Sequence, residues 1–108
     1  MPRNIAEFQI IGQVGKVDER ENVTHASIAA NYNRQVDGEW QSETYWNRVT
    51  CFGRAKDQAE RAEVGDLVRV TGKMKQTSYD RDGETVFTVD LIADSFSVLA
   101  RKDAAGDD

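Results

Sequence analysis

The chain of 108 residues contains one cysteine, one histidine and one proline. A single cysteine, Cys51, excludes an internal disulfide and suits a reducing compartment. No apolar run approaches the roughly 20 residues that a membrane-spanning helix needs. The start, MPRNIAEFQIIG, has one basic residue and a short apolar cluster, which does not resemble a secretory leader. We therefore expect a cytoplasmic protein without membrane contact.

Residue patterns typical of catalytic or cofactor sites are absent from the sequence. It has no Gly-rich phosphate loop, no metal-spaced Cys/His set and no visible nucleophile–base pair. His25 is the only histidine, and no histidine lies near Cys51 in sequence to activate it, which favours a buried thiol. The acidic pair Asp80 and Asp82 falls in a predicted turn. We expect no enzyme, cofactor or metal site; a metal-dependent nuclease built from scattered carboxylates is the alternative.

The net charge of −5 argues at first against a nucleic-acid partner. The last six residues, DAAGDD, contribute three acids and no base, and without them the 14 basic residues leave a net charge of −2. The field of one face decides binding more than the total charge does. Net charge therefore leaves the partner open.

Alternating apolar and polar residues predict five strands, at 8–17, 23–32, 45–52, 67–79 and 84–92. Gly12 and Gly15 mark bends or bulges in the first strand. Asp-Gly pairs at 37–38 and 82–83 predict two hairpin turns. In the fifth strand, we expect Phe87, Val89 and Leu91 to face the core.

The segment 54–66, RAKDQAERAEVGD, is rich in helix formers and predicts a short helix that Gly65 ends. The order is therefore three strands, one helix and two strands, with short connections that favour a mostly antiparallel sheet. This order matches the OB-fold, an all-β, five-stranded Greek-key barrel with one helix between the third and fourth strands. We expect one such domain over residues 1–100, followed by a short acidic tail, 101–108.

The stretch YWNRVTCF, residues 45–52, raises the question of function. One alternate set ends in Val49 and Cys51, which suit a core, because strand side chains alternate between two faces. The opposite set consists of Trp46, Arg48, Thr50 and Phe52. The predicted fourth strand has a similar face, which consists of Arg69, Thr71, Lys73, Lys75, Thr77 and Tyr79. Tyr32 and Trp40 lie on either side of the first hairpin turn.

Aromatic rings interleaved with cations are typical of surfaces that bind single-stranded nucleic acid. Every base can stack on a ring, which contributes about 1–3 kcal/mol per base, and Lys and Arg neutralise phosphates. The main alternative places Trp46 and Phe52 in the core through a one-residue offset. The other structural alternatives are that Trp40 is a cross-strand packing partner, that Tyr79 packs on Lys75, and that Arg48 forms a salt bridge. A different function also remains open, an OB-fold adaptor of a replication or primosome complex that acts through protein or RNA.

The sequence resembles the bacterial single-stranded DNA-binding protein (SSB) family over about residues 5–99. The stretches that carry the resemblance are FQIIGQVGKV, ASIAANYNR, TYWNRVTCFGRAKDQAE and VGDLVRVTGKMKQTSYDRDGETVFTVD. The resemblance implies a nucleoid-associated homotetramer that coats unpaired DNA, without sequence preference, in replication, repair and recombination. It implies stacking by Tyr32, Trp46, Phe52 and Tyr79, and phosphate contacts by Arg48, Arg54, Lys73 and Lys75. We add Trp40 to the stacking residues and Arg34 to the phosphate-contacting residues.

The chain departs from the family pattern at three places. Tyrosine stands at positions 32 and 79, where many members have tryptophan, which implies weaker stacking. Asn47 replaces a histidine that the family links to subunit contacts. The family's long tail, with its acidic tip that recruits repair proteins, has no counterpart after RKDAAGDD. Two interpretations stay open: either the tail was trimmed from this chain, or the chain is a shortened form, plasmid- or phage-borne, that cannot recruit repair proteins by that route.

Overall fold

The computed structural model describes residues 3–102, so residues 103–108 of the predicted tail lie outside it. Its elements follow the predicted order of three strands, one helix and two strands. They are β1 (Glu7–Glu19), β2 (Thr24–Val36), β3 (Glu39–Cys51), α1 (Gly53–Arg61), β4 (Leu67–Arg81) and β5 (Glu84–Ala100).

The strands close into a barrel in the order β1-β2-β3-β5-β4. All neighbours pair antiparallel except β3 and β5, which run parallel where Val49–Cys51 meets Leu91–Ala93. The mostly antiparallel sheet is thus confirmed. The parallel pair is short, yet it closes the barrel and brings the outer faces of β3 and β5 side by side.

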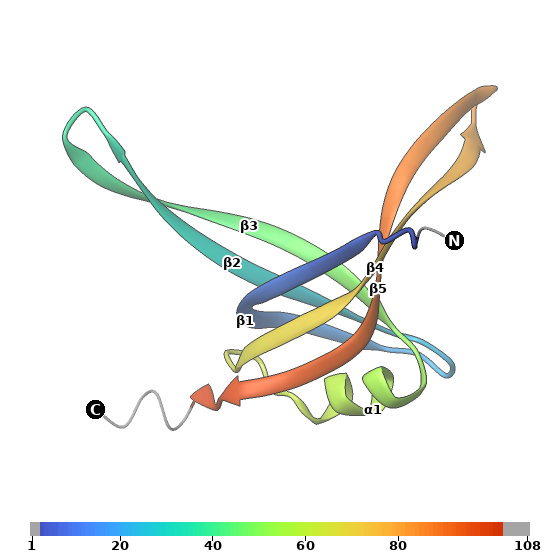
Figure 1. The fold of residues 1–108 in the computed structure, drawn as a ribbon, viewed down its shortest axis with the longest axis horizontal. Coiled ribbons are helices and arrows are strands. Elements are labelled where there is room, and N and C mark those ends of the chain that lie inside the picture. Colours follow the sequence, from blue (N-terminus) through green and yellow to red (C-terminus); the bar gives the residue numbers. More distant parts are fainter. Residues whose placement is uncertain (1–2, 103–108) are drawn as a thin grey trace.

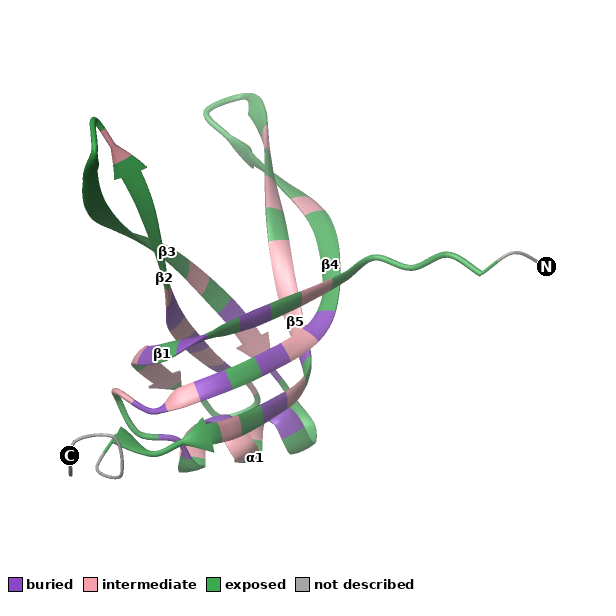
Figure 2. Ribbon diagram, turned by 60° about the vertical axis from the view of Figure 1, so that its left-hand side comes forward, coloured by how far each residue is buried: buried purple, intermediate pink, exposed green. Residues whose placement is uncertain are grey.

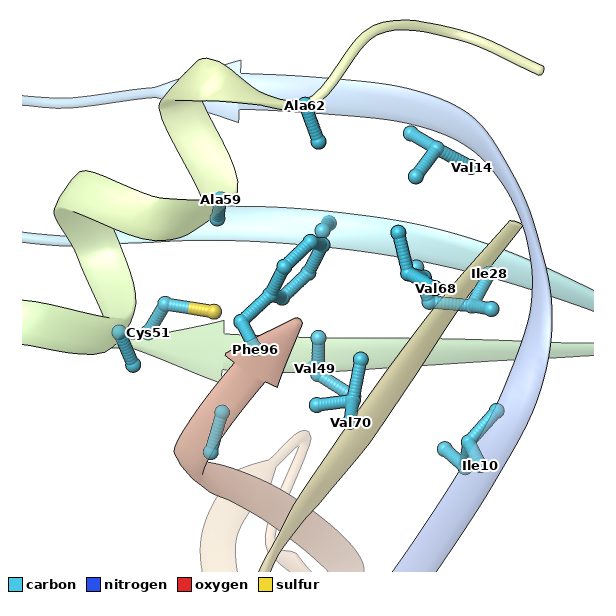
Figure 3. Close-up of a cluster of buried hydrophobic side chains, with 13 residues drawn as sticks. Ile10, Val14, Ile28, Val49, Cys51, Ala59, Ala62, Val68, Val70 and Phe96 are labelled. Atoms are coloured by element: carbon cyan, nitrogen blue, oxygen red, sulfur yellow. The ribbon is translucent and has the colours of Figure 1, made fainter. Parts of the chain in front are cut away.

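The barrel is filled by one apolar core to which every element contributes (Figure 3). Phe96 is its largest fully buried side chain. The helix α1 covers one end of the barrel (Figure 1), where it buries only Ala55 and Ala59. Small residues on this helix face let it approach the strands closely. The other residues of α1 are exposed or half-buried, and Gln58 and Glu60 accept hydrogen bonds from Phe96 of β5 and Thr24 of β2.

Two long hairpins, β2–β3 and β4–β5, project beyond the barrel and diverge from each other (Figure 1). At their tips, Asp37 and Asp82 each have φ of 52°, and the glycines that follow each have φ of 82°. This left-handed backbone is what a two-residue type I′ turn requires, and Asp-Gly adopts it readily. Both predicted hairpin turns are confirmed.

The hairpins overturn one prediction about the fifth strand. Phe87 and Val89 share a face with Leu91, as expected, but they are 63% and 59% exposed. Their segment pairs with the equally projecting part of β4, so no barrel interior lies behind it (Figure 2). The same reason leaves Met74 half exposed on β4.

The helix is shorter than predicted. It ends at Arg61, and Ala62 has an extended backbone, so Gly65 does not stop it. Gly65 instead has φ of 97° in the connection to β4, where its N–H donates to the Val14 carbonyl at 2.8 Å. This glycine therefore docks the connection on β1.

Two glycines of β1 allow close approaches. A Cβ at Gly12 would lie 2.2 Å from the Ala29 carbonyl oxygen of β2. The register of β1 with β2 shifts between Val14 and Lys16, which makes Gly15 the expected bulge. A Cβ at Gly15 would lie 2.4 Å from Cζ3 of Trp46.

Asp66, just before β4, connects the end of β5 to the rest of the fold. Its carboxylate is 1% exposed. It accepts hydrogen bonds from the Glu63 N–H at 2.9 Å, the Arg101 guanidinium at 2.8 Å and the Lys102 N–H at 3.1 Å. The Glu63 N–H above all, with the Lys102 N–H and Arg101, holds the pKa of Asp66 below its usual value against the opposing effect of burial.

Candidate nucleic-acid interface

The alternation of β3 places two aromatic rings in solvent. Val49 and Cys51 are fully buried, while Trp46 is 62% and Phe52 51% exposed. This excludes the one-residue offset that would have put the rings in the core. Arg48 and Thr50 lie between them on the same face. We call this the outer face: it runs from Trp46 of β3 to Phe52, the residue that follows β3, and continues on β5 and β4.

Strand pairing extends the outer face across the barrel. Thr50 lies opposite Ile92 of β5, and Ile92 lies opposite Lys73 of β4. By alternation, Lys75 and Tyr79 share the face of Lys73, and all three are exposed. The outer face therefore combines residues of β3, β5 and β4, as the aromatic and cationic pattern predicts.

The cations of the outer face are available to a ligand. Within residues 3–102, no carboxylate lies within 4.0 Å of a charged nitrogen of Arg48, Lys73 or Lys75. The salt-bridge alternative for Arg48 therefore has no partner in the described part of the chain. Arg54, in the first turn of α1 just past Phe52, is exposed as well.

The indole of Trp46 packs on β1 in the space that a side chain at position 15 would fill. The Cβ position of Gly15 falls within 3 Å of the indole Cζ3 and Cη2 atoms. Trp46 pairs with Ala29 of β2, so two small residues leave room beneath its ring. The ring is held against the barrel while most of its surface stays in solvent.

Tyr32 and Arg34 lie on the opposite face of the β2–β3 hairpin from Trp46. Tyr32 packs on Tyr45 with ring centroids 4.8 Å apart, and the two rings line a hollow of about 210 Å³ beside Ile10 and Ile11 of β1. Arg34 approaches Glu43 at 3.7 Å. The sequence pattern did not single out Tyr45, although its diagonal position to Tyr32 in the hairpin would have shown the pair.

Trp40 lies near the tip of the same hairpin, opposite Gln35. It is 73% exposed, and alternation puts it on the same side of β3 as Trp46. The five rings and five cations that the sequence predicts for the interface are thus distributed over two faces. Trp46, Phe52 and Tyr79 share the outer face with Arg48, Lys73 and Lys75, while Tyr32 and Arg34 do not.

A recess interrupts the outer face beside Phe52. It has a volume of about 350 Å³ and is lined by Val23, His25, Thr50, Phe52, Asp90 and Ile92. His25 Nδ1 lies 3.3 Å from Thr50 Oγ1. Burial, and after it the charge of Arg48, lowers the pKa of His25 below its usual value. The alternation of residues along single strands could not predict the recess, because it forms only where β3 and β5 pair.

Features typical of catalysis are missing from the described residues. Burial raises the pKa of the Cys51 thiol to about 11, which keeps it protonated and unreactive. Residues 3–102 contain no group of three or more His, Cys, Asp or Glu side chains placed to hold a metal ion. No helix among them is long and apolar enough to cross a membrane.

A small barrel of five strands with exposed rings and cations on its outer face is an OB-fold domain of the kind that binds oligonucleotides. The family model described as "Single-strand binding protein family" matches residues 5–99. The chain therefore belongs to the single-strand binding protein family. Proteins of this family are DNA-binding proteins and not enzymes, in agreement with the prediction that the chain has no catalytic activity.

Curated relatives carry the same family name. The single-stranded DNA-binding protein of Aquifex aeolicus is 32% identical over 78 residues, 68% of this chain and 53% of its own. Single-stranded DNA-binding protein 2 of Streptococcus agalactiae is 30% identical over 80 residues, 73% of this chain and 60% of its own. The chain thus matches little more than half the length of these relatives.

Solved structures confirm the OB-fold. The SSB of Plasmodium falciparum, in a complex with ssDNA, superposes with a TM-score of 0.71 at 18% identity, over 92% of this chain and 98% of its own. The mitochondrial single-stranded DNA-binding protein of S. cerevisiae gives a TM-score of 0.69 at 23% identity, over 92% and 99%. The predicted all-β barrel and the family resemblance are both confirmed.

Proposed function

We propose that the protein binds single-stranded DNA without sequence preference, by stacking bases on exposed rings and pairing phosphates with Lys and Arg. The observation that carries the proposal is the outer face of β3. Trp46 and Phe52 remain more than half exposed although buried residues alternate with them. Duplex DNA hides its base faces within its own stack, so these rings favour an unpaired strand.

Stacking accounts for a large share of the expected affinity. Three bases stacked on Trp46, Phe52 and Tyr79 would contribute roughly 3–9 kcal/mol at about 1–3 kcal/mol each. A chain with a net charge of −5 gains little from long-range attraction, although Arg48, Lys73 and Lys75 act locally. We therefore expect a weaker salt dependence than a strongly basic protein shows.

Tyr32, Trp40, Arg34 and Arg54 extend this interface in our proposal. Tyr32 and Trp40 lie on opposite faces of the β2–β3 hairpin. A DNA strand that contacted both rings would therefore have to pass around the edge of the hairpin. The adaptor alternative does not require rings on two faces of one hairpin. This arrangement supports DNA binding by the barrel and its hairpin together.

We further propose that the protein acts in replication, repair and recombination, associated with the nucleoid, as a homotetramer. Support for assembly comes from Ile5, Met74, Phe87 and Val89, which are 68%, 44%, 63% and 59% exposed. Ile5 and Met74 line one hollow, and burial of such side chains against a second copy would stabilise an oligomer. Light scattering should give four chains per particle; a monomer would contradict this part of the proposal.

A titration of labelled oligo(dT) tests the binding mode. Trp46→Ala should weaken binding by about 5- to 150-fold, the equivalent of one lost stack of about 1–3 kcal/mol. Arg34→Ala is the comparison, because its charge is already shared with Glu43 at 3.7 Å, and it should have a smaller effect. Equal or reversed losses would contradict stacking as the main source of affinity, and no binding by the wild type would refute the function.

A further inference from the structure

The recess beside Phe52 opens on the outer face near the end of β3. Strand pairing sets His25 of β2, Thr50 of β3 and Ile92 of β5 in one row across three strands, which forms its floor. Phe52 stands at one end and is half exposed. Asp90, two residues before Ile92 on the same face of β5, borders the recess as well.

Asp90 is a carboxylate that borders the recess on a face whose nearby cations are Arg48, Lys73 and Lys75. Asp18, opposite His25, and Glu7, opposite Lys73, are acids in the adjoining strand β1. The cross-strand neighbour of Asp90 is Lys75, but within residues 3–102 neither Lys75 nor any other cation lies within 4.0 Å of Asp90. Its Oδ2 accepts a hydrogen bond from Thr77 Oγ1 at 3.2 Å, and Thr77 also contacts Thr88 at 3.0 Å. The carboxylate is therefore held in place by β4 and β5, while Oδ1 accepts no hydrogen bond from the described residues.

An ionised carboxylate can only accept hydrogen bonds, and a phosphate has none to donate. In a nucleic-acid interface, Asp90 would repel the phosphate backbone, and among the groups of a DNA strand only a base can donate a hydrogen bond to it. Cytosine, adenine and guanine carry an exocyclic amine, and an Asp or Glu side chain accepts from such groups, as from cytosine N4. Thymine has only its ring N3–H, which two carbonyl oxygens flank and which therefore meets a carboxylate less favourably.

We propose that this recess is a nucleobase subsite in which Phe52 contacts the face of one base and Asp90 accepts a hydrogen bond from its exocyclic amine. The inference rests on the proposed function and adds to it a preference for an amino-bearing base at one position of the footprint. Thr77 is a positioning residue, because it fixes the carboxylate. The other stacking residues remain indifferent to sequence.

The test compares oligo(dC) with oligo(dT) of equal length, at mildly alkaline pH, by fluorescence anisotropy. Homopolymers differ in their own stacking, so the informative quantity is the change in the dC-to-dT affinity ratio between variants. Asp90→Asn should shift this ratio toward dT by about 5- to 10-fold, because a neutral amide oxygen accepts a weaker hydrogen bond than a carboxylate does. The matched control is Asp94→Asn, which removes the same charge from an exposed position of β5 outside the recess and should leave the ratio unchanged.

A second measurement needs no variant. Oligo(dC) in which each base is N4,N4-dimethylcytosine lacks the amine hydrogens, so it should bind the wild type about 10- to 150-fold more weakly than oligo(dC), the equivalent of one lost hydrogen bond to a charged group. An unchanged ratio in Asp90→Asn, together with undiminished binding of the methylated oligomer, would overturn the subsite while both homopolymers still bind. Loss of binding by both homopolymers to the wild type would instead refute the proposed function.

Discussion

Gly15→Ala should weaken single-stranded DNA binding while leaving the fold almost as stable as before. The new Cβ would lie 2.4 Å from Cζ3 and 2.7 Å from Cη2 of Trp46, about 1 Å closer than carbon atoms pack. Gly15 is not among the glycines with positive φ, so its backbone accepts alanine. The indole, 62% exposed, has room to move and must give way.

The magnitudes separate binding from folding. Displacement of an exposed ring costs little in the free energy of unfolding, and alanine offsets about 0.4–1 kcal/mol of it by restricting the unfolded chain. Binding loses part of a stack worth about 1–3 kcal/mol, so we expect about 3- to 10-fold weaker affinity. Trp46→Ala sets the upper limit of this loss.

Gly12→Ala is the matched control, three residues earlier on β1. Its Cβ would lie 2.2 Å from the Ala29 carbonyl oxygen and 2.8 Å from the carbonyl carbon. Backbone atoms within a paired strand cannot move aside, so we expect a loss of about 1–3 kcal/mol in stability. Urea unfolding and anisotropy with labelled oligo(dT) give the two readouts. Wild-type affinity and wild-type tryptophan emission in Gly15→Ala would refute the account of how Trp46 is seated.

Three further predictions concern stability, reactivity and salt. The hydrogen bonds that lower the pKa of Asp66 make its ionised carboxylate stabilising, because the unfolded state binds the proton more readily. The wild type should therefore be more stable than Asp66→Asn above about pH 4, the pKa of an unfolded Asp, and should lose that advantage as the pH falls further. Urea unfolding at several pH values measures this difference. With a pKa of about 11 and full burial, Cys51 should react with a thiol reagent only after unfolding; rapid labelling of the native protein would contradict the buried core position. Lys75→Gln should reduce the slope of log affinity against log salt by about 0.7, the single-strand value for one phosphate contact, and an unchanged slope would remove Lys75 from the interface.

The sequence predicted those features that depend on local pattern. Alternation along β3 identified Trp46 and Phe52 as one face and Val49 and Cys51 as the other, because side-chain direction in a strand is set by position alone. The two Asp-Gly turns were predictable for a similar reason, since few residue pairs adopt their backbone conformation.

Features that depend on where a strand leaves the barrel could not be predicted in this way. Phe87 and Val89 have the right spacing for a core, but they lie beyond it, because periodicity does not say how far a hairpin projects. The recess between Phe52 and Asp90 requires the parallel pairing of β3 with β5, a contact between segments about forty residues apart. The opposite facing of Tyr32 likewise follows from the register of β2 with β3.

The seating of bases on exposed rings is tested most directly with Trp40→Phe, which leaves Trp46 as the only indole of the chain. Oligo(dT) is added at low salt while tryptophan emission and the anisotropy of a label on the DNA are followed together. We expect strong quenching of emission that saturates at the same DNA concentration as the anisotropy. Saturated binding with unchanged emission from Trp46 would contradict the central claim.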